Sequence, residues 1–337
     1  MFIAETNTNE LQLLVYALLQ SHGVAQESRN GNVLRFPTPI VTALTSPLER
    51  VNFCPVRDAN PFFHMMEAMA MLASHNDVKW LCRFNSNMDN YSDDGKRWNA
   101  FYGERLRKFE TDTDTIDQLR TSANILSKDP DSRQVVCQIW MPEYDLDTKS
   151  KDKACNTQIM FERNPNTEEN RLDMHVINRS NDAIWGSVSG ANVVHFSFFQ
   201  EYVAALLEWE MGVYYTYSKN THVYTDGPQW QALRDVKEIP YSYRDCGMRI
   251  GTLIDGGSMD LFDHGLQQFV HMAVDDNTVP PVFAHKFINQ IVVPMYNAWI
   301  YRKYLKDKEQ CKNWIGMIAA DDWRLACTNW VERRESK

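Results

Sequence analysis

The chain has 337 residues, of which 44% are hydrophobic and 23% are charged, and its formal net charge is −9. These values are typical of a globular protein with a sizeable core, and the length allows one large domain or two medium ones. The negative charge argues against a general nucleic-acid binder, because counterion release needs clustered Lys and Arg. It does not exclude a nucleotide substrate, since a few arginines suffice for one phosphate group.

Three further features limit the class of protein. No apolar run approaches the ~20 residues that span a bilayer, and the start MFIAETNTNE lacks the basic and apolar parts of a signal peptide. The seven cysteines show neither metal-ligand spacing nor an even-numbered disulfide framework. We therefore expect a cytoplasmic protein without a membrane partner, a nucleic-acid partner or a metal.

The predicted elements of the first half are mainly helical. Apolar spacing predicts helices over 10–24 and 61–80, the second broken near His75, with a turn at 28–32 between them. Residues 85–95 are polar and loop-like. A third helix is predicted over 115–127, where Thr115 and Gln118 have the spacing of a capping box.

The second half mixes strands and helices. Buried strands are predicted over 134–140, 158–163 and 172–178, with a hairpin tip at 164–169, and a long helix over 193–212 ends at Gly212. A tryptophan-rich helical pattern begins near 276, and its tryptophans suit a core or an interface. The irregular alternation of strands and helices favours one α+β domain over residues 1–275, with the helical segment 276–337 packed on it.

Cys155 is the first candidate for chemistry. Its neighbours Lys151, Asp152 and Lys153 are polar, and nearby cations and turn amides favour the thiolate, which is the nucleophilic form of cysteine. The local pattern alone is a weak signal, because a lone cysteine usually serves packing.

The stronger signal is the order of polar motifs around Cys155. They are Arg29-Asn30-Gly31, Arg57, Glu67, Tyr102-Gly103, Asp131-Ser132-Arg133, Cys155, Arg179-Ser180-Asn181-Asp182, Asn192 and Thr221-His222-Val223-Tyr224. This order resembles thymidylate synthases and their pyrimidine-nucleotide hydroxymethylase relatives over residues 25–230. The rest of the chain resembles that superfamily only loosely.

The resemblance implies a set of catalytic roles. Cys155 would add to C6 of a pyrimidine nucleotide and make C5 nucleophilic, which is covalent catalysis. Glu67 would manage protons through water, and Tyr102 would help to remove the C5 proton. Asn192 would read the pyrimidine edge, because its amide offers both a donor and an acceptor.

The resemblance also implies binding roles and partners. The substrates would be a pyrimidine nucleoside monophosphate and 5,10-methylenetetrahydrofolate, a co-substrate, with no metal. Arg133 would cross from the partner subunit, so the protein would be a sheet-mediated homodimer. The implied positions are Arg29, Arg133, Arg179 and Ser180 at the phosphate, His222 and Tyr224 at the sugar hydroxyl, and Asp182 and Arg57 on the folate side.

Taken singly, these residues have simpler interpretations. Arg179 and Arg133 could form surface ion pairs, and Arg29 could be a solvated turn residue. His222 and Tyr224 could be a strand pair. Among the other histidines we expect structural roles, although His195 lies one turn from Asn192 on the predicted long helix and could belong to the site.

Four departures from the synthases bear on the product. The family's Pro-Cys-His is Ala154-Cys155-Asn156, and the paired arginines after DPDS are Arg133-Gln134. The segment FNSNMDNYSDDG has no tryptophan where synthases carry one, and the chain ends in WVERRESK in place of an apolar tail. About two residues are also inserted before Asn192.

The missing tryptophan and the missing apolar tail favour hydration over reduction. A synthase keeps water from its exocyclic methylene intermediate with a lid and an aromatic wall. A protein without either would give a hydroxymethyl product, as in bacteriophages with modified DNA bases, and its cytoplasm would then be that of the host. Asn192 suits uracil, so deoxyuridylate is the first choice and deoxycytidylate or cytidylate stays open. The alternatives are a thymidylate synthase and a catalytically silent nucleotide-binding dimer.

Overall fold

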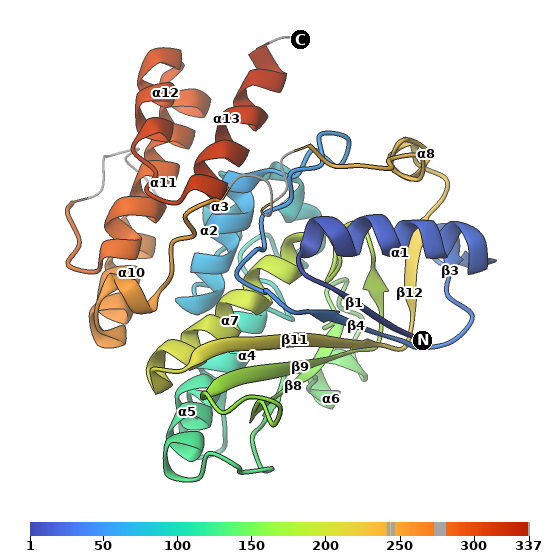
Figure 1. Cartoon of the computed structure of the whole chain (residues 1–337), viewed down its shortest axis with the longest axis horizontal. Coiled ribbons are helices and arrows are strands. Elements are labelled where there is room, and N and C mark those ends of the chain that lie inside the picture. Colours follow the sequence, from blue (N-terminus) through green and yellow to red (C-terminus); the bar gives the residue numbers. More distant parts are fainter. Residues whose placement is uncertain (241–242, 244–246, 273–280, 336–337) are drawn as a thin grey trace.

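A six-stranded mixed sheet forms the centre of the protein, whose computed structural model describes residues 1–240, 243, 247–272 and 281–335 (Figure 1). Its strand order is β1 (Phe2–Glu5), β4 (Ile40–Leu44), β11 (Glu210–Ser218), β9 (Arg171–Asn178), β8 (Asn156–Arg163) and β7 (Val136–Gln138). Two neighbouring pairs, β1 with β4 and β11 with β9, are parallel, and the other pairs are antiparallel. The α+β prediction is confirmed.

A smaller sheet lies beside the large one. Its order is β10 (Asn181–Asp182), β12 (Thr221–Tyr224), β3 (Gly31–Arg35) and β2 (Val24–Ser28). The tight turn between β2 and β3 contains Arg29, as predicted. A short hairpin, β5 (Phe109–Glu110) with β6 (Thr115–Ile116), stands apart from both sheets.

Helix α7 (Ala191–Leu207) is the central helix of the core. It packs on β9 and β11 on one side and on α2 (Pro61–Leu72) on the other, and nearly all its side chains are buried. The remaining helices of this part are α1 (Thr8–His22), α3 (Val78–Cys82), the 3-10 helix η1 (Ser86–Tyr91), α4 (Tyr102–Arg107), α5 (Gln118–Lys128), α6 (Pro142–Asp145) and α8 (Pro228–Leu233).

The C-terminal helices form one end of the molecule, drawn in orange and red in Figure 1. They are the 3-10 turn η2 (Ile254–Gly256), α10 (Met259–Met272), the π turn η3 (Ile288–Val292), α11 (Val293–Ile300), the π turn η4 (Tyr301–Leu305), α12 (Lys308–Gly316) and α13 (Asp321–Glu335). Trp330 of α13 packs edge-on against Phe62 of α2, and Arg333 and Arg334 both pair with Asp58.

The predicted helix over 193–212 is too long. Helix α7 ends at Leu207, because Glu208 takes a left-handed conformation (φ 56°) whose amide closes the last turn. Gly212 lies instead in β11 at a bulge, where a Cβ atom would stand 2.1 Å from Asp173 Oδ1. Glycine is needed there because the backbones approach closely. Gly212 therefore marks a bulge within a strand and not the end of a helix.

The predicted capping box is also wrong. Thr115 lies in β6, and the N-cap of α5 is Asp117, whose side chain accepts from the amide of Arg120. The break expected near His75 is present, with Ser74 at φ 55° between α2 and α3. Of the tryptophans expected in a core or interface, Trp299, Trp323 and Trp330 are buried and Trp314 is partly buried.

Candidate active site

Arg179 holds the loop that carries Cys155. Strands β8 and β9 pair with Asn156 opposite Asn178, so Arg179 follows directly across from Cys155. The amide of Arg179 donates to the Cys155 carbonyl at 2.9 Å, and its guanidinium donates to the carbonyls of Ala154 (2.7 Å) and Lys153 (2.9 Å). Arg179 Nη2 also lies 3.7 Å from Cys155 Sγ. The arginine therefore both shapes the loop and places a positive charge at the sulfur.

Burial and charge act in opposite directions on the Cys155 thiol. Burial raises its pKa and is the largest influence, while the cations Arg179 and Arg29 lower it. Asp152 and Asp182 add to the rise. The guanidinium of Arg179 is therefore the strongest influence that favours the thiolate.

Tyr102 joins the cysteine loop to the helical layer. The amide of Cys155 donates to the Tyr102 hydroxyl at 3.3 Å, and burial raises the pKa of that hydroxyl. Tyr102 reaches this position because α4 packs tightly on α2 at Gly103, where a Cβ atom would lie 2.1 Å from the Met71 carbonyl oxygen. Because residue 103 has no side chain, α4 approaches α2 closely, and this contact sets the distance between Tyr102 and α2.

A cavity of 150 Å³ lies beside this junction. Glu67 of α2, Tyr102 of α4, and Asn192 and His195 of α7 all line it, together with Asp152 from the cysteine loop. Glu67 is buried, with 5% of its surface exposed, and its Oε2 stands 3.5 Å from Nδ1 of His195. Three residues expected at the reacting base, from three separate helices, therefore line one cavity.

Part of the wall of this cavity is aromatic, although the segment FNSNMDNYSDDG carries no tryptophan. Trp98 lies outside the segment FNSNMDNYSDDG, but its buried side chain stacks on Phe101 and lines the cavity, as does Tyr91. The absence of tryptophan from that segment therefore does not argue for hydration.

The smaller sheet collects the residues expected at the phosphate and sugar. His222 and Tyr224 project from β12 with their rings edge to face at 5.3 Å. Tyr224 Oη accepts from Asn30, next to Arg29, at 3.4 Å. Ser180 is half-buried beside Arg179. Arg29 is exposed at the turn, yet its charge lowers the pKa of Cys155, so this sheet lies near Cys155.

Asp182 and Arg57 form a second edge of the site. Asp182 lies opposite His222 in the pairing of β10 with β12, and burial raises its pKa. Arg57 is buried, donates to the Ile184 carbonyl at 2.9 Å and stacks 4.2 Å from the ring centroid of Trp185. Trp185 is 56% exposed. This edge therefore offers an open aromatic surface backed by a cation.

Arg133 is the one predicted site residue that stays far from Cys155 in the same chain. It precedes β7, and the antiparallel pairing of β7 with β8 sets it beside Arg163, whose Nε donates to Asp131 at 3.0 Å. Cys155 directly precedes the opposite end of the eight-residue β8, about 26 Å from Arg163 at ~3.3 Å per residue. Arg133 is exposed and has no ion-pair partner among the described residues.

The sequence predicted only a possible site role for His195 and did not indicate Trp98. One signal for His195 was available, because residues three apart on a helix share a face, and Asn192 was already a candidate. No comparable signal marked Trp98, which reaches the cavity only through the fold of the loop after η1.

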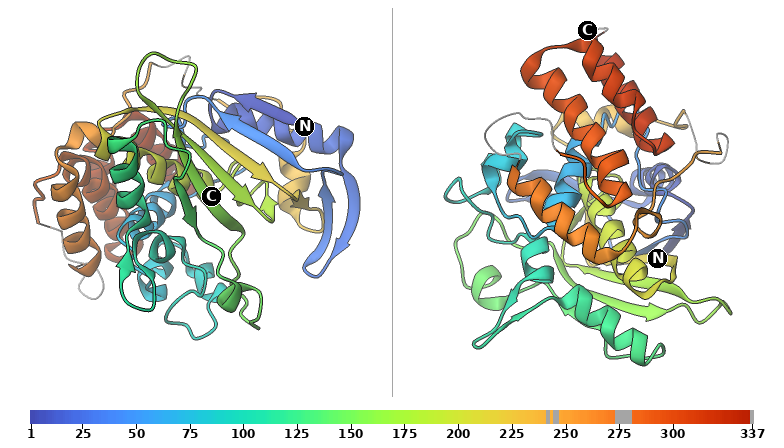
Figure 2. Two further views of the ribbon diagram at one scale, coloured as in Figure 1. Left: turned by 90° about the horizontal axis from the view of Figure 1, so that it is seen from below. Right: turned by 90° about the vertical axis from the view of Figure 1, so that its left-hand side faces the viewer.

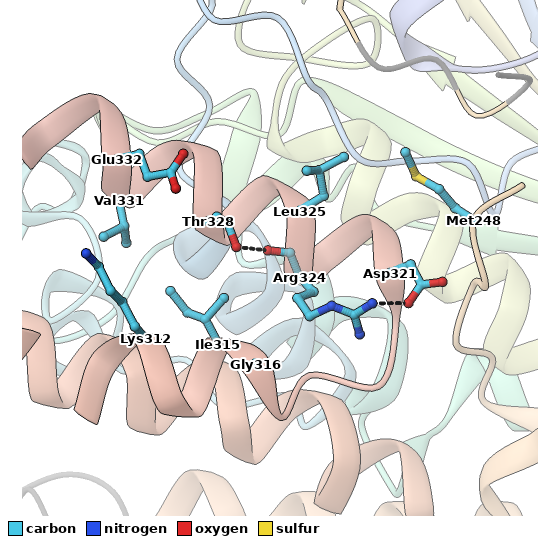
Figure 3. A pocket seen from close by; sticks show the side chains of 10 residues that line it. All are labelled: Met248, Lys312, Ile315, Gly316, Asp321, Arg324, Leu325, Thr328, Val331 and Glu332. Carbon is cyan, nitrogen blue, oxygen red and sulfur yellow. Dashed lines mark hydrogen bonds and ion pairs between the residues drawn. The ribbon is translucent and has the colours of Figure 1, made fainter. Parts of the chain in front are cut away.

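A second pocket, of 540 Å³, lies between α12 and α13 (Figure 3). Three of its charged side chains form ion pairs: Arg324 pairs with Asp321, as the dashed line shows, and Lys312 pairs with Glu335, which lies outside the lining. None of the predicted site residues lines it. We therefore place the candidate active site at the smaller cavity, which Glu67, Tyr102 and Asn192 line. Cys155 is not part of its lining but contacts it through Tyr102.

The fold and the grouping of these residues agree with the comparisons. The sequence profile of the family described as thymidylate synthase matches residues 22–245. A deoxyuridylate hydroxymethyltransferase of Pseudomonas phage M6 is 36% identical over 345 aligned residues, which cover 97% of this chain and 93% of the relative. One of Bacillus phage SP01 is 36% identical over 208 residues, covering 60% and 53%. A putative thymidylate synthase of Methanosarcina mazei is 30% identical over 36% of this chain and 52% of its own.

The class defined by this fold is therefore that of thymidylate synthase-like enzymes. The chain belongs to the thymidylate synthase family and is a one-carbon transferase. This family implies two substrates, a nucleotide and a folate co-substrate. No helix in the described ranges is long and apolar enough to cross a membrane.

Proposed function

We propose that the protein is a deoxyuridylate 5-hydroxymethylase. It transfers the one-carbon unit of 5,10-methylenetetrahydrofolate to C5 of the nucleotide and then adds water. The observation that carries the proposal is the similarity to the phage M6 hydroxymethyltransferase, which extends over nearly all of both chains. Similarity to thymidylate synthases covers much less of the chain.

Cys155 acts as the nucleophile in this proposal. Its thiolate adds to C6, and the electron pair that moves to C5 attacks the one-carbon unit of the folate. Arg179, 3.7 Å from the sulfur, favours the thiolate. Tyr102, hydrogen-bonded to the Cys155 amide, helps to remove the C5 proton. The bond between the one-carbon unit and the folate nitrogen then breaks, tetrahydrofolate leaves, and the exocyclic methylene intermediate remains.

The substrate lies between the cysteine loop and the smaller sheet. Arg29, Arg179 and Ser180 bind the phosphate, for which guanidinium groups give charge-assisted hydrogen bonds. His222 and Tyr224 bind the sugar hydroxyl, and Asn192, which lines the cavity, pairs with the uracil edge. Deoxycytidylate and cytidylate remain the competing substrates.

The folate lies on the opposite edge. Asp182 accepts from the pterin. One of its carboxyl oxygens, Oδ1, already accepts from the amides of Ile184 and Trp185, which fixes the orientation of the side chain. Trp185 offers a stacking surface for the pterin. Arg57 stacks on the Trp185 ring and holds that side chain in place.

We further propose a homodimer in which Arg133 of each chain completes the phosphate site of its partner. Arg133 cannot reach Cys155 within one chain. Figure 2 shows the sheet from below. Two of its strands carry exposed apolar side chains, Val136 of β7 (52% exposed) and Tyr217 of β11 (41% exposed). Apolar side chains are enriched at the interfaces of homodimers.

Product analysis tests the proposed function. The protein is incubated with methylenetetrahydrofolate and, in turn, dUMP, dCMP and CMP, and the nucleotide product is identified by mass. We expect hydroxymethyl-dUMP without dihydrofolate, and no product from Cys155→Ala. A rise in dihydrofolate absorbance together with a methyl product would instead establish a thymidylate synthase.

A further inference from the structure

His195 is a buried histidine without a hydrogen-bond partner in the described part of the chain. Its side chain is 2% exposed, and neither ring nitrogen is satisfied by the protein. The facing oxygen, Oε2 of Glu67, is equally unsatisfied, although it stands 3.5 Å from His195 Nδ1. Burying such groups unpaired costs free energy, so the arrangement points to a polar molecule that bonds to both.

The cavity that the two residues line suits water. Its 150 Å³ exceeds the volume of one water molecule, ~30 Å³. Its polar lining comes from Glu67, Tyr102, Asn192, His195 and Asp152. His195 lies on the central helix α7, packed between Tyr102 (ring centroids 5.9 Å) and Phe199 (6.2 Å), so its ring has little freedom to move.

We infer that His195 is a catalytic base of the hydration step, working with Glu67. The inference rests on the proposed hydroxymethylase function and assigns its second half-reaction to named groups. The water lies in the cavity that His195 and Glu67 both line, beside Tyr102, whose hydroxyl accepts from the Cys155 amide. Tyr102, which contacts the cysteine loop directly, serves the earlier loss of the C5 proton.

The step balances without another reactant. The water oxygen bonds to the exocyclic methylene carbon, and the displaced electron pair moves through C5 onto the C4 oxygen as an enolate. His195 takes one proton of the water, and Glu67 stabilises the resulting imidazolium. Collapse of the enolate restores the C5–C6 double bond and expels the Cys155 thiolate, which regains a proton from the pair.

The test measures how the intermediate partitions, because this ratio is independent of the amount of folded protein. C5-tritiated dUMP and methylenetetrahydrofolate are mixed with each variant in the presence of 2-mercaptoethanol, which adds to the same methylene carbon. Tritium release reports formation of the intermediate. The ratio of hydroxymethyl product to thioether product reports the hydration step alone.

For His195→Asn we expect tritium release within about threefold of wild type and a product ratio at least ~10-fold lower, since a general base contributes on the order of 10²-fold or more. The control is His285→Asn, which changes a histidine with 0% exposure outside the cavity and should leave the ratio unchanged. If His195→Asn does not fold, His195→Gln carries the same measurement.

Two results would overturn the inference. One is an unchanged product ratio in the folded His195 variant. The other is a parallel loss of tritium release and of both products, which would assign His195 to an earlier step. Failure of the proposed function looks different, because the wild-type protein itself would then give no hydroxymethyl nucleotide.

Discussion

At the scale of single residues, Arg179 is the side chain on which the nucleophile depends most. It holds two carbonyls of the cysteine loop and is the largest influence lowering the pKa of Cys155. Burial acts against it, so the thiol titrates above its ordinary range. The thiolate fraction therefore rises with pH on the alkaline side, and the position of that rise depends on the guanidinium charge.

Arg179→Gln removes this charge, and we expect the pKa of Cys155 to move further upward because a neighbouring cation no longer favours the thiolate. The measurement is the pH dependence of Cys155 alkylation by iodoacetamide, followed by mass analysis of its peptide. Arg179→Lys keeps a positive charge and should shift the midpoint less. Equal midpoints in all three proteins would show that Arg179 acts on the loop alone.

At the scale of elements, the contact between α4 and α2 sets the geometry of the cavity. The two helices carry Tyr102 and Glu67, and they meet where Gly103 lies against the backbone of Met71. A short helix of six residues has little stability of its own. Its position therefore depends on this tertiary contact.

Gly103→Ala should separate α4 from α2 and displace Tyr102. We expect a loss of about 1–3 kcal/mol in the free energy of unfolding. We also expect tritium release to fall by more than the loss of folded protein accounts for. Chemical denaturation and the tritium assay measure the two effects. Gly316→Ala at the end of α12 is the matched control, because a Cβ atom there meets nothing within 4 Å; similar losses in both variants would argue against the contact.

At the scale of the whole molecule, the proposed homodimer would complete the set of arginines around Cys155. Arg133 and Cys155 lie at opposite ends of the β7–β8 pair. In a two-fold symmetric dimer, the same surface of each subunit faces the other. Each site can then take its missing cation from the neighbouring chain.

Mixing inactive subunits tests this arrangement. Cys155→Ala and Arg133→Ala should each have little activity, while co-expression should restore up to about a quarter of the wild-type sites, because half of the randomly paired dimers carry one intact site. Cys155→Ala mixed with Arg179→Ala is the control and should stay inactive, since both residues belong to one chain's site. Absence of recovery in the first mixture would contradict the crossing of Arg133.

Local patterns carried much of the fold prediction. The strands at β8 and β9 and the helices α1, α2 and α5 were located within a few residues, because apolar periodicity reflects burial. The end of α7 was missed, since the left-handed Glu208 and the bulge at Gly212 depend on packing against β9. The N-terminal strands β1 and β4 were also missed, because their pairing partners lie far along the chain.

The sequence by itself determined the chemical identity of the candidate site, from Cys155 and Arg179 to Asn192 and His222, because the order of reactive residue types is written in the chain. Only the tertiary structure decided which of them meet. It brought Glu67 and His195 to one cavity, placed Trp98 in its wall, and set Arg133 far from Cys155. The physical reason is that distances between elements depend on helix packing and strand register, which no local pattern encodes.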